Sequence, residues 1–221
     1  GDIRTFHPPA GAFEGIIGGP PCQQFSKFRF LNPQAGKKHG NLIPEFERVV
    51  SETQPCWFLM ENVQDAPEPA IDGYTTHCLL LNNRWLPDVD GIGGEQNRKR
   101  RFCFGTRDGR RLDVELALLE SPIHEFAVTS SASKVPVKIG GSGKIKKTHK
   151  PPTVHGGHSE PFGNPGYSIA QMCKYQGLPE DFLSEAPFTV HGKRKVIGNG
   201  VPLIMGRAIA KAVRKAIEAR R

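Results

Sequence analysis

The 221-residue chain has no long hydrophobic run, and this absence limits the classes of protein to which it can belong. No window approaches the roughly 18 to 20 consecutive apolar residues that a membrane-spanning helix requires. The first residues, GDIRTFHPPAG, have neither the basic nor the apolar region of a signal peptide. We therefore expect a cytoplasmic protein with no membrane partner.

Cysteine is scarce, and no two cysteines form a C-x-x-C pair. The five are odd in number and scattered along the chain: Cys22, Cys56, Cys78, Cys103 and Cys173. This usage indicates neither a disulfide framework nor a zinc site, so we expect reduced thiols and no metal. Acidic residues are outnumbered by basic ones, 22 to 30, and the net charge of +8 favours a polyanionic partner.

Two apolar runs predict a parallel pair of strands within an α/β sheet. Residues 13–17 (FEGII) are followed by glycine and proline, and residues 56–60 (CWFLM) are followed by Glu61. Between these runs, LIPEFERVVSETQ has its apolar side chains at helical spacing. The order strand, helix, strand is typical of parallel pairing. A third strand is expected at residues 101–106 (RFCFGT).

Two reactive side chains follow the first two predicted strands. In GGPPCQQFS, two glycines and two prolines restrict the backbone before Cys22, an arrangement that suits a nucleophile as well as a small buried thiol. Glu61 either ends its strand in water or holds a proton near neutral pH. Because ligands collect at the carboxyl ends of parallel strands, both side chains are expected in one crevice.

Basic residues precede the third predicted strand. Arg98 and Arg100 alternate with neighbours in QNRKRR, which places both guanidinium groups on one face. They form either a solvated basic edge or a partner for an anionic backbone and a thiolate.

The remainder of the chain divides into a loop-rich segment and a helical one. Residues 108–165 are rich in Ser, Gly, Pro, Lys and His. Ser168 and Gln171 then have capping-box spacing, and a long helix is expected after Pro202. Its apolar stripe is predicted to belong to the core and consists of Ile209, Val213 and Ile217, with Ala208, Ala212 and Ala216 beside them.

Five segments, in the order GGPPCQQFS, ENV, QNRKRR, YQGLPEDF and IGNGVP, resemble the consecutive motifs of the DNA cytosine-5 methyltransferases. The resemblance implies an α/β, Rossmann-like class I S-adenosylmethionine-dependent methyltransferase fold with a small target-recognition module. The implied divisions are a catalytic domain over 1–107, the recognition module over 108–165, and a carboxy-terminal segment over 166–221 that returns to the catalytic domain. The implied activity is methyl transfer from S-adenosylmethionine to carbon 5 of cytosine in double-stranded DNA. A restriction-modification or phage-protection role in a bacterial or phage-infected cell follows from the same resemblance.

The resemblance also implies a role for individual residues. Cys22 matches the nucleophile that adds to carbon 6 of a flipped-out cytosine, and Glu61 matches the carboxyl group at the ring nitrogen. Arg98 and Arg100 match arginines near the cysteine, where positive charge favours thiolate, and Gln96 would support them. The implied cofactor residues are Asp2, Ile3, Pro21, Leu42 and Asn199. The expected DNA-binding residues are Gln23, Ser26, Gln96, Lys144, Lys146 and Lys147.

The chain departs from the family in lacking the glycine-rich F-x-G-x-G turn. DGIGGE at residues 90–95 follows no buried strand and opens no helix, so we interpret it as a loop. We expect either a chain truncated at its amino end or a second polypeptide that supplies the missing half, and partial exposure of the stripe of the last helix. The alternative function is a catalytically silent or partner-dependent DNA-binding fragment or subunit of such an enzyme.

Overall fold

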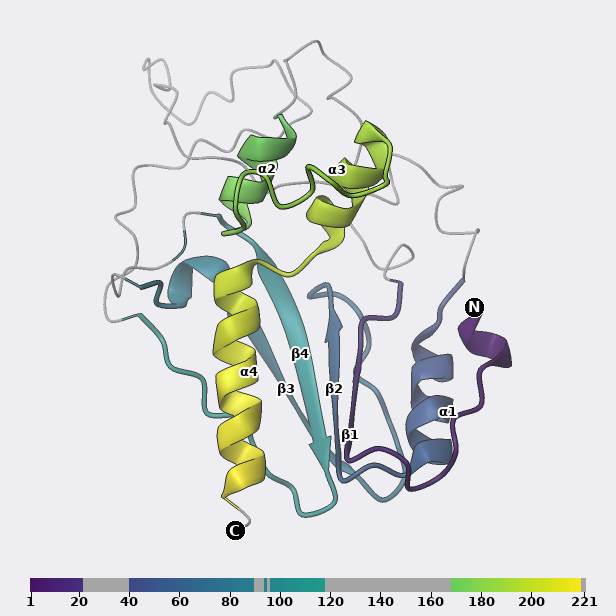
Figure 1. The fold of residues 1–221 in the computed structure, drawn as a ribbon. Helices are drawn as coiled ribbons and strands as arrows, with labels where there is room; N and C mark the ends of the chain where they lie inside the picture. Colours follow the sequence, from purple (N-terminus) through teal and green to yellow (C-terminus); the bar gives the residue numbers. More distant parts are fainter. Residues whose placement is uncertain (22–39, 90–93, 95, 118–167, 220–221) are drawn as a thin grey trace, which may run out of the picture. The chain divides into compact units, whose positions relative to one another are not determined.

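The computed structural model describes residues 1–21, 40–89, 94, 96–117 and 168–219 (Figure 1). The chain divides into two compact units. The first consists of residues 1–81, 99–113 and 212–221, and the second of residues 82–98 and 114–211. The predicted recognition module, 108–165, lies mostly outside the described residues, so that boundary stays a prediction.

A four-stranded mixed sheet forms the first unit, in the order β1-β2-β4-β3 (Figure 1). Its elements are η1 (Ile3–Thr5), β1 (Gly15–Gly18), α1 (Ile43–Thr53), β2 (Trp57–Asn62), β3 (Thr75–Asn82) and β4 (Lys99–Thr106). Strand β1 is parallel to β2, with Gly18 opposite Met60, and β2 is antiparallel to β4. The predicted strand, helix, strand unit is confirmed, and β3 is an element that the sequence did not predict.

The apolar face of α1 packs against the sheet and forms the core of the first unit. Phe46 of α1 meets Phe58 of β2 edge to face, with ring centroids 5.8 Å apart, and Phe58 meets Tyr74 at 5.4 Å. Both phenylalanines are buried, and burial of such a side chain contributes about 1.5–3 kcal/mol to folding. Helix α1 has a proline in its first turn and ends at Gln54, whose φ of 51° is left-handed.

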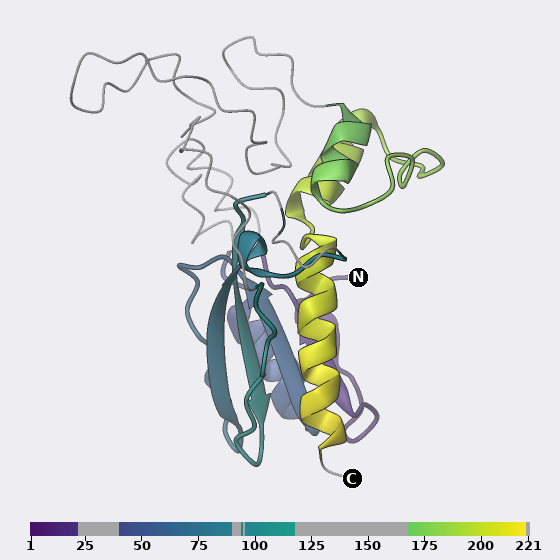
Figure 2. The same ribbon diagram turned by 90° about the vertical axis from the view of Figure 1, so that its left-hand side faces the viewer.

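The described helices of the second unit are α2 (Ile169–Tyr175), α3 (Val190–Asn199) and the first part of α4 (Leu203–Glu218), with η4 (Asn83–Trp85) before them. The predicted capping box is confirmed, because the Ser168 side chain and the Gln171 side chain bond each other's backbone amide. Helices α2 and α3 lie side by side (Figure 2) and share a small core of Met172, Cys173, Leu183 and Ile197.

Helix α4 continues from the second unit into the first, which it enters at Ala212. The predicted core stripe is confirmed, because Ile209, Ala212 and Val213 are buried, and Ala208, Ala216 and Ile217 are partly exposed. No single helix of the described residues is long and apolar enough to cross a membrane, although α3 and α4 taken together as a bent pair reach that length and composition.

One expectation about the cysteines is wrong. Cys78 of β3 and Cys103 of β4 form a disulfide across adjacent strands, whereas the sequence predicted only reduced thiols. The reason is that β3 was not predicted, so nothing placed these two cysteines side by side. Cys56 and Cys173 are free, and burial raises the pKa of the Cys173 thiol. Within the described residues, no group of three or more metal-ligating side chains is present.

Candidate active site

A cavity of about 480 Å³ lies beside β1 in the first unit. This volume falls within the range of about 300–1,000 Å³ that is usual for small-molecule sites. Its walls are mainly apolar and include Ile3, Pro21 and Leu42, three of the five residues predicted to bind the cofactor. These residues come from three separate parts of the chain, and the fold brings them to one cavity.

Glycine at the end of β1 keeps this cavity compact. A Cβ atom at Gly18 would lie only 2.6 Å from the ring of Phe46, so glycine allows α1 to pack closely against the strand. Both residues line the cavity. The first two residues of the GGPP segment (residues 18–21) therefore shape the cavity as well as the loop that leads to Cys22.

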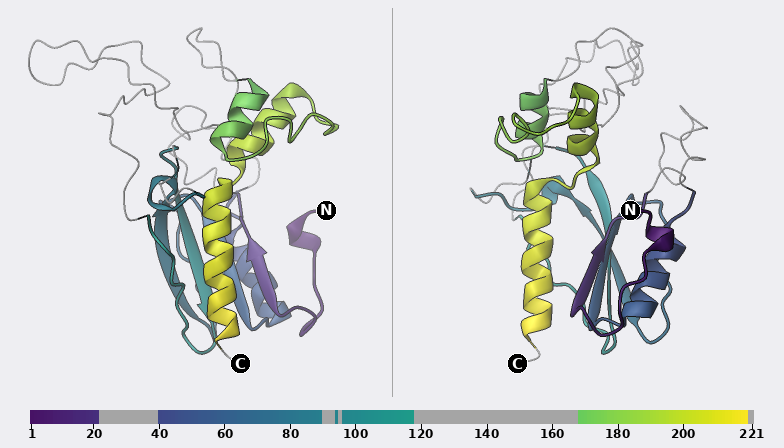
Figure 3. Two further views of the ribbon diagram at one scale, coloured as in Figure 1. Left: turned by 60° about the vertical axis from the view of Figure 1, so that its left-hand side comes forward. Right: turned by 45° about the vertical axis from the view of Figure 1, so that its right-hand side comes forward.

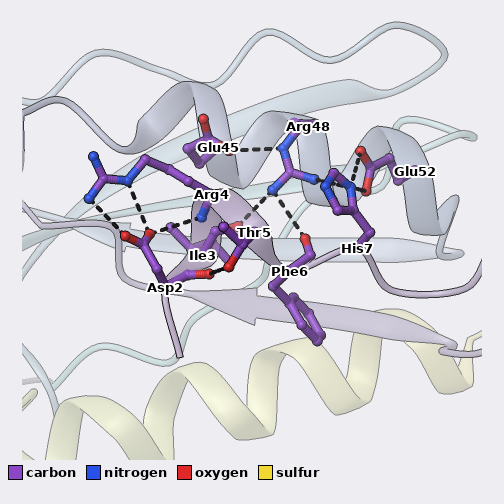
Figure 4. Close-up of polar contacts among 9 residues, drawn as sticks. All are labelled: Asp2, Ile3, Arg4, Thr5, Phe6, His7, Glu45, Arg48 and Glu52. Carbon is purple, nitrogen blue, oxygen red and sulfur yellow. Dashed lines mark hydrogen bonds and ion pairs between the residues drawn. The ribbon is translucent and has the colours of Figure 1, made fainter.

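The amino-terminal segment, residues 2–8, forms one wall of the cavity and runs back along α1 (Figures 3 and 4). Asp2 caps η1, and its carboxylate accepts hydrogen bonds from Nε and Nη2 of Arg4 at 3.0 and 2.9 Å. Ile3, the next residue, lines the cavity. The structure thus places Asp2 beside the cavity wall with its charge partly balanced by Arg4.

The carboxylate of Glu61 is paired with a guanidinium group. Nε of Arg100, on β4, lies 2.8 Å from Oε1 of Glu61, on the neighbouring β2, and both side chains are largely buried. A Cβ atom at Gly19 would lie 3.3 Å from Oε2 of Glu61, so the backbone of the GGPP segment passes close to this carboxylate. The fold therefore brings together Glu61, Arg100 and the start of the segment that carries Cys22.

A hydrogen bond holds that segment at the end of β2. The Asn62 side-chain amide donates to the Pro20 carbonyl oxygen at 3.2 Å. Cys22, Gln23 and Ser26 follow directly but lie outside the described residues, so their predicted roles stay predictions. The same holds for the predicted DNA-binding lysines Lys144, Lys146 and Lys147.

Arg98 has different partners from Arg100. It belongs to the second unit and is buried, and its Nη2 donates to the carbonyl oxygens of Gly198 and Gly200 at 2.6 and 3.0 Å. Gly198 lies in the last turn of α3, and Gly200 follows that helix before α4 begins. In the structure Arg98 holds this turn, and its predicted place near the cysteine stays a prediction.

Two buried glutamines complete this arrangement in the second unit. Nε2 of Gln96 donates to the Tyr175 carbonyl oxygen at 3.0 Å and to Oε1 of Gln176 at 3.2 Å. Gln176 donates in turn to the Ile197 carbonyl oxygen at 2.6 Å. Because Gln96 is fully buried, a direct contact with DNA would require this segment to rearrange.

This network joins three of the sequence motifs: QNRKRR, YQGLPEDF and IGNGVP. Asn199, the fifth predicted cofactor residue, is the exposed last residue of α3 in the second unit. Its contact with a cofactor stays a prediction.

The sequence did not single out Arg48, which contacts the amino-terminal wall of the cavity from α1 (Figure 4). The sequence signal for Arg48 was the spacing of its acidic neighbours, since Glu45 lies three residues before it and Glu52 lies four residues after it. Such spacing indicates ion pairs on a helix surface, and it carries no information about a backbone partner more than forty residues away.

Comparison with known proteins identifies the family. Residues 1–151 match the family model of the C-5 cytosine-specific DNA methylases. The Type II methyltransferase M.HgiDI of Herpetosiphon aurantiacus is 35% identical over 118 residues, which cover 51% of this chain and 35% of the relative. The Type II methyltransferase M1.HphI of Haemophilus parahaemolyticus is 26% identical over 90% of this chain and 68% of the relative. This chain thus spans about a third of the length of M.HgiDI and about two thirds of that of M1.HphI.

Solved structures show the same fold at low sequence identity. The methyltransferase EhMeth of Entamoeba histolytica superposes with a TM-score of 0.56 at 13% identity and covers 94% of this chain, which covers 78% of that structure. The Dnmt2 methyltransferase of S. pombe gives a TM-score of 0.54 at 12% identity, with coverage of 100% and 84%. The fold is therefore that of the Rossmann-like methyltransferases, as the sequence predicted. The comparisons give no support for the second polypeptide that the sequence left open.

Proposed function

The chain belongs to the C-5 cytosine-specific DNA methylase family, and from this membership we propose that it takes part in methyl transfer from S-adenosylmethionine to carbon 5 of cytosine in double-stranded DNA. The observation that carries the proposal is the position of Glu61. Its carboxylate is paired with Arg100 and lies beside the backbone that leads to Cys22. A restriction-modification role is proposed by analogy with the Type II relatives.

The cavity beside β1 fits the adenosyl part of the cofactor. An apolar slot lined by Ile3, Phe6 and Leu42 suits a planar heterocycle, and the Asp2 carboxylate at the neighbouring position offers an acceptor for an amino group. When bound, S-adenosylmethionine supplies the electrophilic methyl group. Asn199 is also proposed to contact the cofactor.

Carbon 5 of cytosine is a poor nucleophile, so the ring must be activated before the methyl group can be transferred. We assign this step to Cys22, whose thiolate forms a bond to carbon 6 while Glu61, which must be protonated for this step, passes its proton to the ring nitrogen and becomes a carboxylate. Carbon 5 would then be the nucleophile toward the methyl group that bound S-adenosylmethionine would supply, with S-adenosylhomocysteine as the leaving group. Transfer of the carbon 5 proton to solvent water, return of the ring-nitrogen proton to Glu61 and cleavage of the bond between sulfur and carbon 6 would restore the aromatic ring and free Cys22.

The base has to leave the duplex to reach these side chains, at a cost of a few kcal/mol. The Arg100 guanidinium holds the Glu61 carboxylate in place on the neighbouring strand, so this residue is positioned before the base arrives. Arg98 is proposed to act near the cysteine, and Gln23, Ser26 and Gln96 to contact or support contacts with DNA. Lys144, Lys146 and Lys147 are proposed to neutralise phosphates.

Trapping with 5-fluorocytosine tests the proposal. Fluorine at carbon 5 blocks the elimination that frees the enzyme, so duplex DNA containing this base and S-adenosylmethionine should give a complex that survives denaturation. Cys22→Ser should abolish the complex. Cys56→Ser, which changes a free and exposed thiol, should leave it intact and is the matched control.

The same experiment separates the proposal from the second candidate. An adduct that persists in Cys22→Ser would remove the nucleophile assignment. If the wild-type chain binds duplex DNA and forms no adduct, a catalytically silent or partner-dependent DNA-binding fragment is the better description.

A further inference from the structure

Two walls of the cavity come from segments far apart in the sequence. Ile3 and Phe6 line it from the amino-terminal segment, and Phe46 and Val49 line it from α1. The three-residue turn η1 is too short to keep its own position, and Phe6 is 52% exposed. Contacts with the rest of the first unit therefore decide where this wall stands.

The Arg48 side chain provides such a contact. Its Nη2 donates to the carbonyl oxygen of Ile3 at 2.7 Å and to that of Phe6 at 3.1 Å (Figure 4). These are the backbone groups of the two residues whose side chains line the cavity. One guanidinium group thus fixes both positions of the wall relative to α1.

Two carboxylates on α1 fix the orientation of this guanidinium group. Nε of Arg48 donates to Oε2 of Glu45, and Nη1 donates to Oε2 of Glu52, each at 2.8 Å. Because the guanidinium is planar, holding two of its edges directs the remaining N–H groups toward the amino-terminal segment. Nδ1 of His7 also lies 3.1 Å from both Glu52 oxygens and from Nη1, so the segment is held at a further point.

The charges of this cluster are consistent with a formed ion pair. The hydrogen bond from Arg48, followed by that from His7, holds the pKa of Glu52 below its usual value. The carboxylate is therefore ionised at neutral pH and remains available to orient the arginine.

From this geometry we infer that Arg48 is a positioning residue for the cofactor cavity, which sets the separation between the amino-terminal wall and α1 and thereby the affinity for an adenosyl ligand. The inference rests on the proposed function for the identity of that ligand. Arg48 is not a lining residue of the cavity, so it acts through the backbone of Ile3 and Phe6.

Three variants of the chain test this role. Arg48→Met removes every hydrogen bond and keeps most of the aliphatic stem, and Arg48→Lys keeps the charge but cannot bond both carboxylates and both carbonyls. Arg214→Met is the matched control because Arg214 of α4 forms an i,i+4 ion pair with Glu218, at 2.7 Å, of the kind that Arg48 forms with Glu52. Arg214 is exposed, and its ion-pair partner lies on the same helix rather than in the amino-terminal segment.

The first measurement needs no ligand. Hydrogen exchange of the backbone amides of residues 3–7 should become faster in Arg48→Met, to a smaller extent in Arg48→Lys, and not in Arg214→Met, because the segment loses its anchor on α1. Unchanged exchange in Arg48→Met would overturn the positioning role whatever the ligand is.

The second measurement is calorimetric titration with S-adenosylhomocysteine at concentrations up to the millimolar range. Arg48→Met should raise Kd by about tenfold, equivalent to roughly 1.4 kcal/mol of binding free energy, with Arg48→Lys between it and the wild type. Affinity for duplex DNA should not change, because Arg48 bonds to Glu45, to Glu52 and to the backbone of the amino-terminal segment, none of which is proposed to bind DNA.

The outcomes separate this inference from the proposed function. Faster exchange together with an unchanged Kd for S-adenosylhomocysteine would overturn the role of Arg48 in ligand binding and leave the cofactor assignment standing. Failure of the wild-type chain to bind S-adenosylhomocysteine at all would overturn the cofactor assignment and, with it, the ligand named here.

Discussion

At the scale of single residues, the surroundings of Glu61 differ from those of an ordinary surface carboxylate. It is the penultimate residue of β2, lies beside Gly19 and forms a largely buried ion pair with Arg100 of the adjacent strand β4. Arg101, the next residue of β4, forms a similar ion pair at 3.2 Å with Glu68, which lies after β2 in the chain. The Glu68 side chain in this pair is 61% exposed. The two pairs share their chemistry and differ in burial and in their distance from the Cys22 segment.

This contrast gives a matched test of catalysis. Glu61→Gln keeps the shape of the side chain but cannot deliver a proton, so methyl transfer to duplex DNA should fall by at least about 100-fold. Glu68→Gln should leave the rate nearly unchanged, because an exposed ion pair contributes little. Transfer of a labelled methyl group measures both rates, and equal midpoints of thermal unfolding exclude a folding defect. Similar rates for Glu61→Gln and the wild type would contradict the proton-donor role.

At the scale of elements, the polar network of the second unit links three short motifs that are far apart in the sequence. Arg98 and Gln176 are buried and donate to backbone carbonyls at the end of α3, and the buried Gln96 donates to the last carbonyl of α2 and to the Gln176 side chain. The Leu203 amide also donates to the Gln176 carbonyl oxygen at 2.8 Å. A turn closed in this way depends on amide and guanidinium groups that apolar side chains cannot replace.

Removal of one amide from the network should therefore destabilise the fold. Gln176→Met keeps the side-chain volume but removes the hydrogen bond that Gln176 donates to the Ile197 carbonyl and the one that it accepts from the Gln96 amide, so the free energy of unfolding should fall by about 1–3 kcal/mol. Gln171→Met changes an exposed glutamine of α2 and should cost less. Urea unfolding followed by circular dichroism measures both. An equal loss in the two variants would mean that the buried network contributes nothing beyond a surface cap.

The elements differ in how far the sequence predicted them. The pair β1 and β2 and the helix between them were predictable because their apolar residues follow the periods of strand and helix. The helix α3 was not predicted, since VHGKRKVIGN carries few apolar residues, and only Ile197 joins the small core. Its start is set instead by Thr189, whose side chain accepts a hydrogen bond from the Gly192 amide.

The contacts of the candidate site also divide into those that the sequence predicted and those that it did not. The positions of Glu61, Pro21 and Leu42 follow from strand and helix ends, which local sequence indicates. Arg48 donates to a backbone carbonyl that lies 45 residues earlier in the chain. Arg98 donates to a backbone carbonyl that lies 100 residues later in the chain. Contacts of this kind depend on tertiary packing, for which a single sequence carries no periodic signal.

At the scale of the whole molecule, the segment that follows β4 is tied to the last turns of α4. Nη1 of Arg110 donates to the Ala216 carbonyl oxygen at 2.8 Å, and Lys215 pairs with Asp113. These four residues all belong to the first unit, whereas α4 begins in the second unit. Ion pairing with Arg110 lowers the pKa of Asp108, and pairing with Lys215 lowers that of Asp113, so these carboxylates stay ionised at neutral pH. Because a helix end leaves its last carbonyls without partners, the arginine supplies a cap.

The excess of positive charge is a property of the whole chain, and its use in DNA binding is the last prediction. Six lysines lie between residues 132 and 150, interrupted by three glycines, in a region outside the described residues: Lys134, Lys138, Lys144, Lys146, Lys147 and Lys150. If they neutralise phosphates, each lost contact should lower the slope of log affinity against log salt by about one. Replacement of Lys144, Lys146 and Lys147 by alanine should then weaken cognate and random duplexes alike.

Titration of both duplexes at several salt concentrations measures this slope. Lys211→Ala is the control, because Lys211 lies on α4 and pairs with Glu115 at 2.7 Å, so its loss should not change the slope. An unchanged slope in the triple variant would mean that these lysines are only solvated. A loss of affinity confined to one sequence would instead assign them to base recognition, since phosphate contacts carry no sequence information.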